Sequence, residues 1–318
     1  MDAATGSRAP SVEGNAAASD MPASTRKTGA AILVDLLPPA TVFVTIVAWM
    51  FLPRAWTENP WSILVAGLLT SFFLLALEQV FERHESWRLN RTEFATDLFY
   101  VILMYSVIGW AVAFLVDEPL MALKQSLGIA TPWIAQLPFI VQVALVILLV
   151  ELGQYWMHRA MHDIYPLWLT HAPHHHITQL NAMKGFVGNP VELFLISLSV
   201  LALFDFDLAA LFCGLNVLGV ISGYAHANIR SDPPKFYSFF FTTIRHHSLH
   251  HTALSYEDTR CNYGNSLILL DRIFGTYREG ESEIVGQDDR RRLSIREQFL
   301  FPIQPLLAKA KSGGTDER

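Results

Sequence analysis

The sequence predicts an all-α integral membrane protein with about four transmembrane helices, a short re-entrant or tilted hairpin, and a cytosolic helical cap carrying histidine clusters. Of the 318 residues, 52% are hydrophobic and only 16% are charged, whereas soluble domains carry about 25% charged residues. Four apolar stretches are long enough to cross a bilayer, which takes about 20 residues. Nine histidines recur, mostly at helical spacing, after the fourth stretch.

The composition also argues against several classes of protein. The chain has two cysteines, Cys213 and Cys261, and no C-x-x-C pair, so disulfide frameworks, iron–sulfur clusters and thiolate zinc sites are not expected. The net charge of −6 is spread along the chain and gives no reason to expect nucleic acid. The sequence contains no dinucleotide glycine fingerprint, P-loop or haem-attachment motif.

Composition divides the chain into three parts. Residues 1–28 are rich in Ala, Ser, Gly and Pro, which predicts a disordered cytoplasmic tail. They lack the apolar core and cleavage site of a signal peptide. The membrane-embedded domain is expected over residues 29–280, and a polar C-terminal tail over residues 281–318.

The predicted spans alternate across the membrane. The loop between the second and third spans carries Arg83, Arg88 and Arg91, and the positive-inside rule places it in the cytoplasm. Counting onward, the end of the fourth span, and with it His158, returns to the cytoplasmic side. The four spans are residues 31–52, 61–77, 98–116 and 133–150.

Two further segments are expected to lie at or within the membrane. Residues 117–131 carry leucines at near-helical spacing and predict a short amphipathic interfacial helix. The apolar region 193–225 is interrupted by Asp205 and Asp207. Its first arm has twelve residues, about 18 Å of helix, which is too short to span. A re-entrant or shallow hairpin, or two tilted helices, would bring His226 back to the face bearing the other histidines.

The histidines recur with a common spacing. His158 and His162 are four residues apart, so on a helix they share one face. Two later clusters, 171–175 and 247–251, repeat an i, i+3, i+4 pattern. Imidazole is the commonest metal ligand, and buried imidazoles without partners are costly. His84, His176 and His246 fall outside the repeated spacing and are interpreted as packing residues. The predicted metal ligands are His158, His162, His171, His174, His175, His226, His247, His250 and His251.

Ligand chemistry narrows the choice of metal. The clusters contain no cysteine, which argues against metals that prefer soft ligands. The segment H-R-A-M-H lacks the glutamate of a zinc protease. Nine candidate ligands exceed what one ion accepts and suit two ions with open positions. Zinc would fill the same ligands without redox chemistry, so spacing does not separate the metals, and an oxidative role favours iron.

Two carboxylates lie near the histidine clusters. Glu151 is two helical turns before His158. It is either an interfacial cap or a hydrogen-bond acceptor that orients a ligand imidazole. Asp271 is expected to cap a helix or to pair with Arg272 rather than to touch metal.

These motifs resemble the fatty acid hydroxylase/sterol desaturase superfamily of integral-membrane di-iron oxygenases, and the resemblance covers about residues 95–280. Two positions depart from the common pattern, since His176 stands where serine is common and Glu151 where aspartate is common. The matching boxes are His158-x3-His162, His171-x2-His174-His175 and His247-x2-His250-His251. Matching residues around them include Tyr155-Trp156-x-His158-Arg159, Leu167-Trp168, Asn181, His226-Ala227-Asn228, Asn262-Tyr263-Gly264 and Asp271-Arg272-Ile273-Phe274-Gly275-Thr276-Tyr277.

The resemblance implies a membrane stalk capped by a cytosolic site holding two iron ions. It also implies oxidation of a lipid C–H bond, by hydroxylation or desaturation, with dioxygen as co-substrate. Fatty acyl chains, sterols, carotenoids, alkylglycerols and aminolipids all remain possible substrates. The apolar segment 186–204 follows the second cluster, so the substrate is expected to arrive sideways from the bilayer.

Such chemistry needs electrons from outside the substrate. The chain has no recognisable site for a donor cofactor, so a ferredoxin or a cytochrome b5-like protein with its reductase is expected to dock on the cytoplasmic face. Candidate cations for docking are Arg83, Arg88, Arg91, Arg159, Lys184, Arg230, Lys235 and Arg245.

Two other functions stay open on the sequence. A metal-ion transporter would also place histidines in a membrane protein, but transporter sites lie near the midplane on broken helices, and the four predicted spans contain no histidine. A non-catalytic, metal-containing lipid-binding protein would keep the same clusters without turnover.

Overall fold

The computed structural model describes residues 28–287 and 290–305, so the predicted N-terminal tail lies, apart from Thr28, outside the described residues. Over the described ranges the regular elements are helices, joined by loops with two isolated β-bridges. The all-α fold is therefore confirmed.

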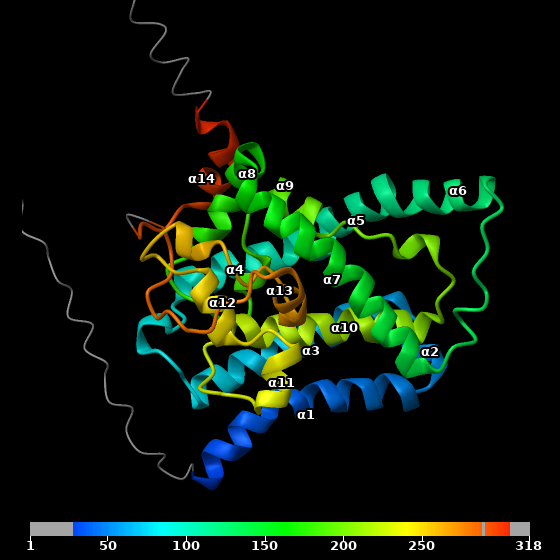
Figure 1. The fold of residues 1–318 in the computed structure, drawn as a ribbon, viewed down its shortest axis with the longest axis horizontal. Coiled ribbons are helices and arrows are strands. Elements are labelled where there is room, and N and C mark those ends of the chain that lie inside the picture. Colours follow the sequence, from blue (N-terminus) through cyan, green and yellow to red (C-terminus); the bar gives the residue numbers. More distant parts are fainter. Residues whose placement is uncertain (1–27, 288–289, 306–318) are drawn as a thin grey trace, which may run out of the picture.

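Five helices are long and apolar enough to cross a membrane, and they extend between the two ends of the molecule (Figure 1). The chain is a multi-pass membrane protein. The five are α1 (Gly29–Phe51), α3 (Pro60–Val80), the continuous run Arg91–Ser126, α7 (Phe139–Asp163) and α10 (Leu208–His226).

Short polar residues start several of these helices. Asn59 precedes Pro60 at the start of α3, and its side chain accepts a hydrogen bond from the Trp61 amide. Proline at the first helical position costs no hydrogen bond. Asp207 caps α10 in the same way, accepting from the Ala209 and Ala210 amides. The charge at Asp207 therefore begins a new helix. The short segment α2 (Arg54–Thr57) joins α1 to α3.

The third apolar region differs from the expectation. The predicted interfacial helix is not separate, because the chain stays helical from Arg91 to Ser126. Pro119 does not interrupt it, since it stands in the first turn of α6, directly after a π-helical segment. The run consists of α4 (Arg91–Leu103), η2 (Met104–Ile108), α5 (Gly109–Val112), η3 (Ala113–Asp117) and α6 (Glu118–Ser126).

The apolar region 193–225 forms a hairpin, and its second arm, α10, is long and apolar enough to cross a membrane. The first arm holds α9 (Pro190–Ile196) and η5 (Leu201–Leu203). The bend that follows lies at the end of the molecule bearing α2, because Asp207 forms an ion pair of 3.0 Å with Arg54. From there α10 returns to the opposite end and finishes at His226.

Helix α10 forms the centre of the membrane domain. Within its most apolar window 61% of the residues are buried, against 17% for α1 and α3. Its apolar side chains Val217 and Ile221 pack in one cluster with Trp49 of α1 and Val143 of α7. The large apolar side chains of α1 and α3 are mostly exposed, as expected for helices that face lipid.

A cap of short helices covers the end of the bundle opposite α2 (Figure 1). Val285 and Leu293 are buried there, so the described part of the predicted C-terminal tail folds against the cap. Arg83, which follows α3, donates hydrogen bonds to Glu281 of this tail and to Asp232, in the segment after α10. It thereby connects the tail to the membrane domain. The elements are η1 (Glu85–Trp87), α8 (Tyr165–His175), η4 (Lys184–Phe186), α11 (Lys235–Phe240), α12 (Ile244–His250), η6 (Glu257–Thr259), α13 (Ile268–Phe274), α14 (Ile295–Leu300) and η7 (Phe301–Ile303).

Candidate metal centre

All nine histidines singled out by the sequence lie together in the folded chain, in two neighbouring groups. Within each group one ligand atom from every residue lies within 4.8 Å of the others, and every residue is buried. The first group is His158, His162, His171, His175 and His250, and the second group is His174, His226, His247 and His251.

Helical spacing explains how each cluster serves both groups. On α8, His171 and His175 are one turn apart and face the first group, while His174 faces the second. The cluster on α12 divides the same way, with His250 in the first group. The rings of His175 and His251 stack with centroids 4.5 Å apart, so the two groups share a boundary.

Hydrogen bonds fix the tautomers of several rings. His158 Nδ1 lies 2.7 Å from the Tyr263 carbonyl, and His250 Nδ1 lies 2.7 Å from the Cys261 carbonyl. A carbonyl only accepts, so each Nδ1 must carry the proton, and in a neutral imidazole Nε2 then carries a lone pair. The same argument applies to His174 and His226, which donate to the carbonyls of Val187 and Ser222.

These lone pairs point at one another. His158 Nε2 lies 3.0 Å from His250 Nε2, and neither atom has a proton to share when both Nδ1 atoms donate to carbonyls. Converging lone pairs in a buried site are unfavourable unless a cation lies between them, so the first group fits a bound metal ion. In the second group, His226 Nε2 lies 2.8 Å from His247 Nε2. Because His247 Nδ1 has no hydrogen-bond partner, one tautomer of His247 donates from Nε2 to His226, and this group fits a metal ion through its four converging buried imidazoles.

The spacing and number of nitrogens also bear on the metal. Metal–imidazole bonds of about 2.1 Å that meet at right angles place their nitrogens about 3.0 Å apart. The Nε2 separations within the first group include 3.0 Å and 3.1 Å. Five imidazoles exceed the four ligands of a structural zinc site. The first group thus suits a metal of higher coordination number.

Four of the grouped histidines on α8 and at α12 have lowered pKa values, which favours their neutral form. Burial lowers the pKa of His171 to about 3. Burial, followed by the proximity of other imidazoles, lowers the pKa of His175, His250 and His251 well below the usual value. Neutral imidazole is the form that binds metal.

Four rings in these groups have a nitrogen that is buried without a hydrogen-bond partner. For His162 this holds for both nitrogens, and for His175, His247 and His251 it holds for Nδ1. Buried polar atoms without a hydrogen-bond partner are rare in folded proteins. The orientation of these rings is therefore set by packing more than by hydrogen bonds. A ring with two nitrogens that lack a partner has one free for a metal.

The carboxylate that touches a candidate ligand is Glu192, which the sequence analysis did not single out. Its Oε1 lies 2.6 Å from His171 Nδ1, and burial raises the pKa of Glu192 to about 8. A cation on the far side of the ring would favour the ionised carboxylate and a proton on Nδ1. Glu192 is the N3 residue of a capping box with Asn189, and this three-residue spacing is the signal that could have identified it.

Glu151, for which the sequence left open a role as an interfacial cap or as an acceptor from a ligand imidazole, makes no hydrogen bond to a ligand ring among the described residues. It is fully buried, and its Oε2 accepts a hydrogen bond of 3.0 Å from the Leu267 amide. It therefore anchors the segment before α13 rather than a ligand ring. Asp271 does not pair with Arg272. Its carboxylate accepts from the Tyr263 and Gly264 amides, which holds the loop whose carbonyl accepts from His158.

The remaining predicted side chains lie outside the two groups. His84 contacts Glu281 at 2.8 Å, and His246 caps α12 through Thr243. Lys184 is only 2% exposed and pairs with Glu93 and Asp97. Lys184 is therefore too buried to contact a donor protein, and it does not belong among the candidate docking cations.

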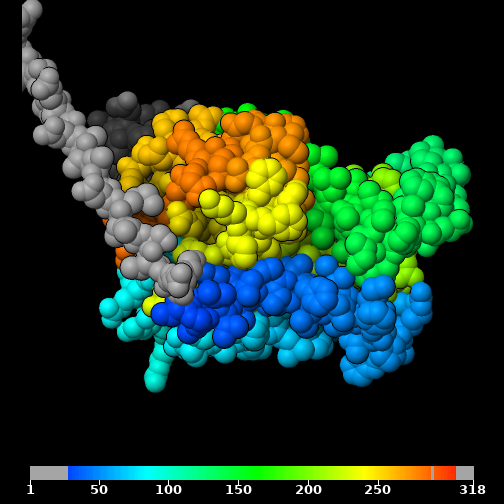
Figure 2. Space-filling view, turned by 60° about the horizontal axis from the view of Figure 1, so that its bottom comes forward, coloured from blue at the N-terminus to red at the C-terminus, as the bar shows by residue number. Residues whose placement is uncertain are grey.

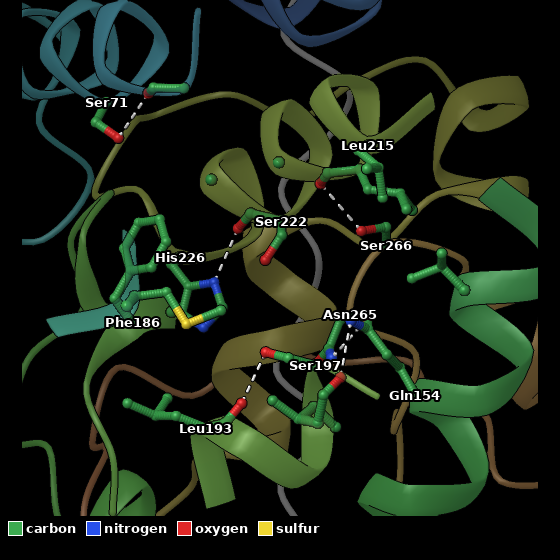
Figure 3. A pocket seen from close by; sticks show the side chains of 18 of the residues that line it. Ser71, Gln154, Phe186, Leu193, Ser197, Leu215, Ser222, His226, Asn265 and Ser266 are labelled. Carbon is green, nitrogen blue, oxygen red and sulfur yellow. Dashed lines mark hydrogen bonds between the residues drawn. The ribbon is translucent and has the colours of Figure 1, made fainter. Parts of the chain in front are cut away.

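A cavity of about 330 Å³ opens beside the histidines, between α3, α7, α9 and α10. Figure 3 shows His226 and Ser222 of α10 on one side, with Leu193 of α9 and Ser197, which follows α9, opposite. His158, His171 and His174 also line it. Apart from Glu192, no lining residue carries a formal charge, so the cavity suits an uncharged part of a ligand.

The chain is similar to known lipid-modifying enzymes. Residues 143–276 match the family model described as fatty acid hydroxylase. The chain is 26% identical to ornithine lipid hydroxylase OlsE of Rhizobium tropici over 266 residues, covering 78% of this chain and 76% of that protein.

Two other relatives match over shorter regions. A Delta(7)-sterol-C5(6)-desaturase of Nicotiana tabacum is 29% identical over 158 residues, which are 46% of this chain and 53% of that protein. The human alkylglycerol monooxygenase is 30% identical over 139 residues, which are 43% of this chain and 30% of that protein. The chain thus spans about half or less of these two relatives.

No solved structure matches the chain. The matched region, residues 143–276, contains all nine grouped histidines together with most of α7 and all of α8 to α13. The relatives named above are a hydroxylase, a desaturase and a monooxygenase. Over the matched region, this chain is therefore similar to the fatty acid hydroxylase/sterol desaturase superfamily.

Proposed function

We propose that the chain binds two iron ions through the nine grouped histidines and oxidises a C–H bond of a membrane lipid, by hydroxylation or desaturation, with dioxygen and external electrons. The observation that carries this proposal is the opening of both histidine groups onto one nearly uncharged cavity between the membrane helices. Bound there, iron would supply the redox chemistry that activates dioxygen toward a C–H bond.

The protein's own residues hold and orient the site. Backbone carbonyls of Tyr263, Cys261 and Val187 accept the Nδ1 protons of three ligands and aim their Nε2 atoms inward. Glu192 does the same for His171 and holds a proton within the pair. Leu193 and Leu215 form apolar parts of the cavity wall beside the rings.

The two alternative functions are less well supported. A transporter would bring its ligands to the middle of the bilayer. His158 and His162 do lie on a spanning helix, α7, but in its last turns, and His226 is the last residue of α10. A non-catalytic lipid-binding protein has no need for ligand nitrogens at the wall of its lipid cavity.

We further propose that the site faces the cytoplasm. The basic loop that follows α3 lies at the histidine end, because the Asn228 side chain accepts from the His84 amide and donates to the His84 carbonyl. The positive-inside rule assigns such a loop to the cytoplasm. A ferredoxin or cytochrome b5-like donor would then meet the exposed Arg88 and the partly exposed Arg159 and Arg245 there.

The test measures metal content and oxygen uptake of the purified protein in lipid nanodiscs made from a bacterial lipid extract. We expect about two irons per chain. With a donor, its reductase and NADH or NADPH, we expect oxygen uptake that depends on the presence of lipid. Mass spectrometry should find lipid products heavier by one oxygen or lighter by two hydrogens. Iron binding without any oxidised lipid would refute the proposed reaction.

A further inference from the structure

The cavity beside the histidines is small for the substrate that the proposed function requires. Its volume of about 330 Å³ is at the lower end of the range for drug-sized ligands, about 300–1,000 Å³. A membrane lipid with long alkyl chains is larger than such ligands. A chain whose reactive carbon lies beside His226 therefore needs further space.

A second, larger hollow provides that space. A groove of about 680 Å³ lies between α1 and α3 on the side of these helices that faces lipid. Figure 2 shows α1 on the molecular surface, where its outer side is open. None of the residues lining the groove carries a formal charge; they include Val44 and Trp49 of α1 and Val65 and Leu69 of α3.

Two residues line both hollows and therefore separate them by the width of one side chain. Thr70 of α3 and Asn216 of α10 line both the groove and the histidine cavity. Thr70 turns its hydroxyl to the Ala66 carbonyl at 2.9 Å, and Asn216 accepts a hydrogen bond of 3.3 Å from the Trp49 indole. The Thr70 hydroxyl and the Asn216 carbonyl oxygen are thus both engaged in hydrogen bonds within the membrane helices.

We propose that the α1–α3 groove binds an alkyl chain of the membrane lipid substrate, and that Thr70 and Asn216 form the neck through which the chain reaches the histidine cavity. This inference rests on the proposed function. It places the chain's access on the α1–α3 side rather than over residues 186–204. In the latter segment Leu193 and Ile196 line the cavity, but no residue of it lines the groove.

The groove also indicates the direction of the bound chain. Trp56 and Trp61 line its far end near α2, and they are 66% and 70% exposed. Exposed tryptophans are typical of the membrane interface. The groove therefore runs from the interface opposite the cap to the neck, and the cavity continues from the neck to the histidines.

The experiment uses full-length protein in nanodiscs that contain a phosphatidylcholine with a diazirine at the end of one acyl chain. After irradiation, mass spectrometry maps the labelled residues. We expect label on groove residues such as Val44 and on cavity residues such as Leu193. Thr70→Trp should reduce cavity labelling at least 10-fold and keep groove labelling. The matched control is Val107→Trp, at a position 55% exposed that lines neither hollow, and it should behave as wild type.

A second variant covers the case in which Thr70→Trp does not fold. Thr70→Cys can be blocked after folding with a benzyl methanethiosulfonate, because the native Cys213 and Cys261 are fully buried. Cavity labelling that persists in the blocked protein, or that is missing from wild type, would overturn the proposal. Labelling needs neither iron nor turnover, so failure of the proposed reaction would be seen separately in oxygen uptake.

Discussion

Replacing Glu192 by Gln tests whether a carboxylate outside the ligand set controls metal affinity. The substitution keeps the side-chain volume and one oxygen that can accept from His171 Nδ1. It removes the negative charge and the second oxygen, which accepts from the Asn189 amide at 3.2 Å. Only His171 of the first group contacts Glu192, so one of two metal ions should be affected.

The magnitude follows from the buried contact of 2.6 Å. Removing such an outer partner of a metal-bound histidine typically costs about 10- to 100-fold in metal affinity. That range corresponds to about 1.4–2.7 kcal/mol. We expect a loss of this size in the first group and little change in the second.

The assay titrates metal-free protein with Fe²⁺ under anaerobic conditions against a competing chelator and resolves the two binding steps. Glu297→Gln is a matched control, because Glu297 is also the N3 residue of a capping box, in α14, and contacts neither histidine group. Wild-type affinity for both ions in Glu192→Gln would refute the reasoning. An equal loss for both ions would point to general unfolding of the cap instead.

Three other substitutions or measurements address the rest of the site. His250→Ala should remove activity and at least one bound ion, whereas His84→Ala should keep both ions in metal analysis; full activity in His250→Ala would exclude the ligand set. Reporters fused at residue 1 and after residue 318 should report the same side of the membrane, and opposite sides would mean a miscounted span. Burial raises the pKa of Glu281, but the hydrogen bonds and charge of Arg83, with His84, lower it to about 2. Because this value lies below the ordinary 4.5, the contact stabilises the fold above about pH 4.5 and is lost as pH falls toward 2. Glu281→Gln should therefore flatten the pH dependence of thermal unfolding between about pH 4.5 and 2, and an unchanged slope would contradict this assignment.

The sequence predicted the structure correctly where the helical spacing of residues along one element decides it. His158 and His162, or His171 and His175, must share a helix face, and the structure brings each pair into one group. Apolar length likewise indicated the spanning helices. The assignment of His174 and His250 to different groups is a tertiary property, since it depends on how α8 and α12 meet.

The carboxylates illustrate the limit of periodicity. Glu151 shares a helix face with His158, yet its partner is the Leu267 amide, more than a hundred residues away in sequence. Glu192 reaches His171 only because the chain turns back at Asn189 after α8. Neither contact follows from spacing along one element.

Charged residues near apolar stretches were the other place where the structure differs from the sequence-based expectation. Asp207 reads as an interruption of a hydrophobic region, but its side chain caps α10 and so begins a full-length helix. Lys184 reads as a surface cation, whereas Glu93 and Asp97 on another helix allow it to be buried. Buried charges need partners, and the partners here come from distant segments.

Under the proposed function, the two histidine groups link the stability of this protein to the supply of its metal. Four chain segments, which carry His158, His175, His226 and His250, converge on the groups, and a bound cation would relieve the repulsion between the Nε2 lone pairs of His158 and His250. A ligand at about 100 times its dissociation constant stabilises a fold by about 2.7 kcal/mol. Cells short of metal would therefore hold the cap in a looser, protease-sensitive form, and the amount of protein would follow metal availability without a dedicated regulator.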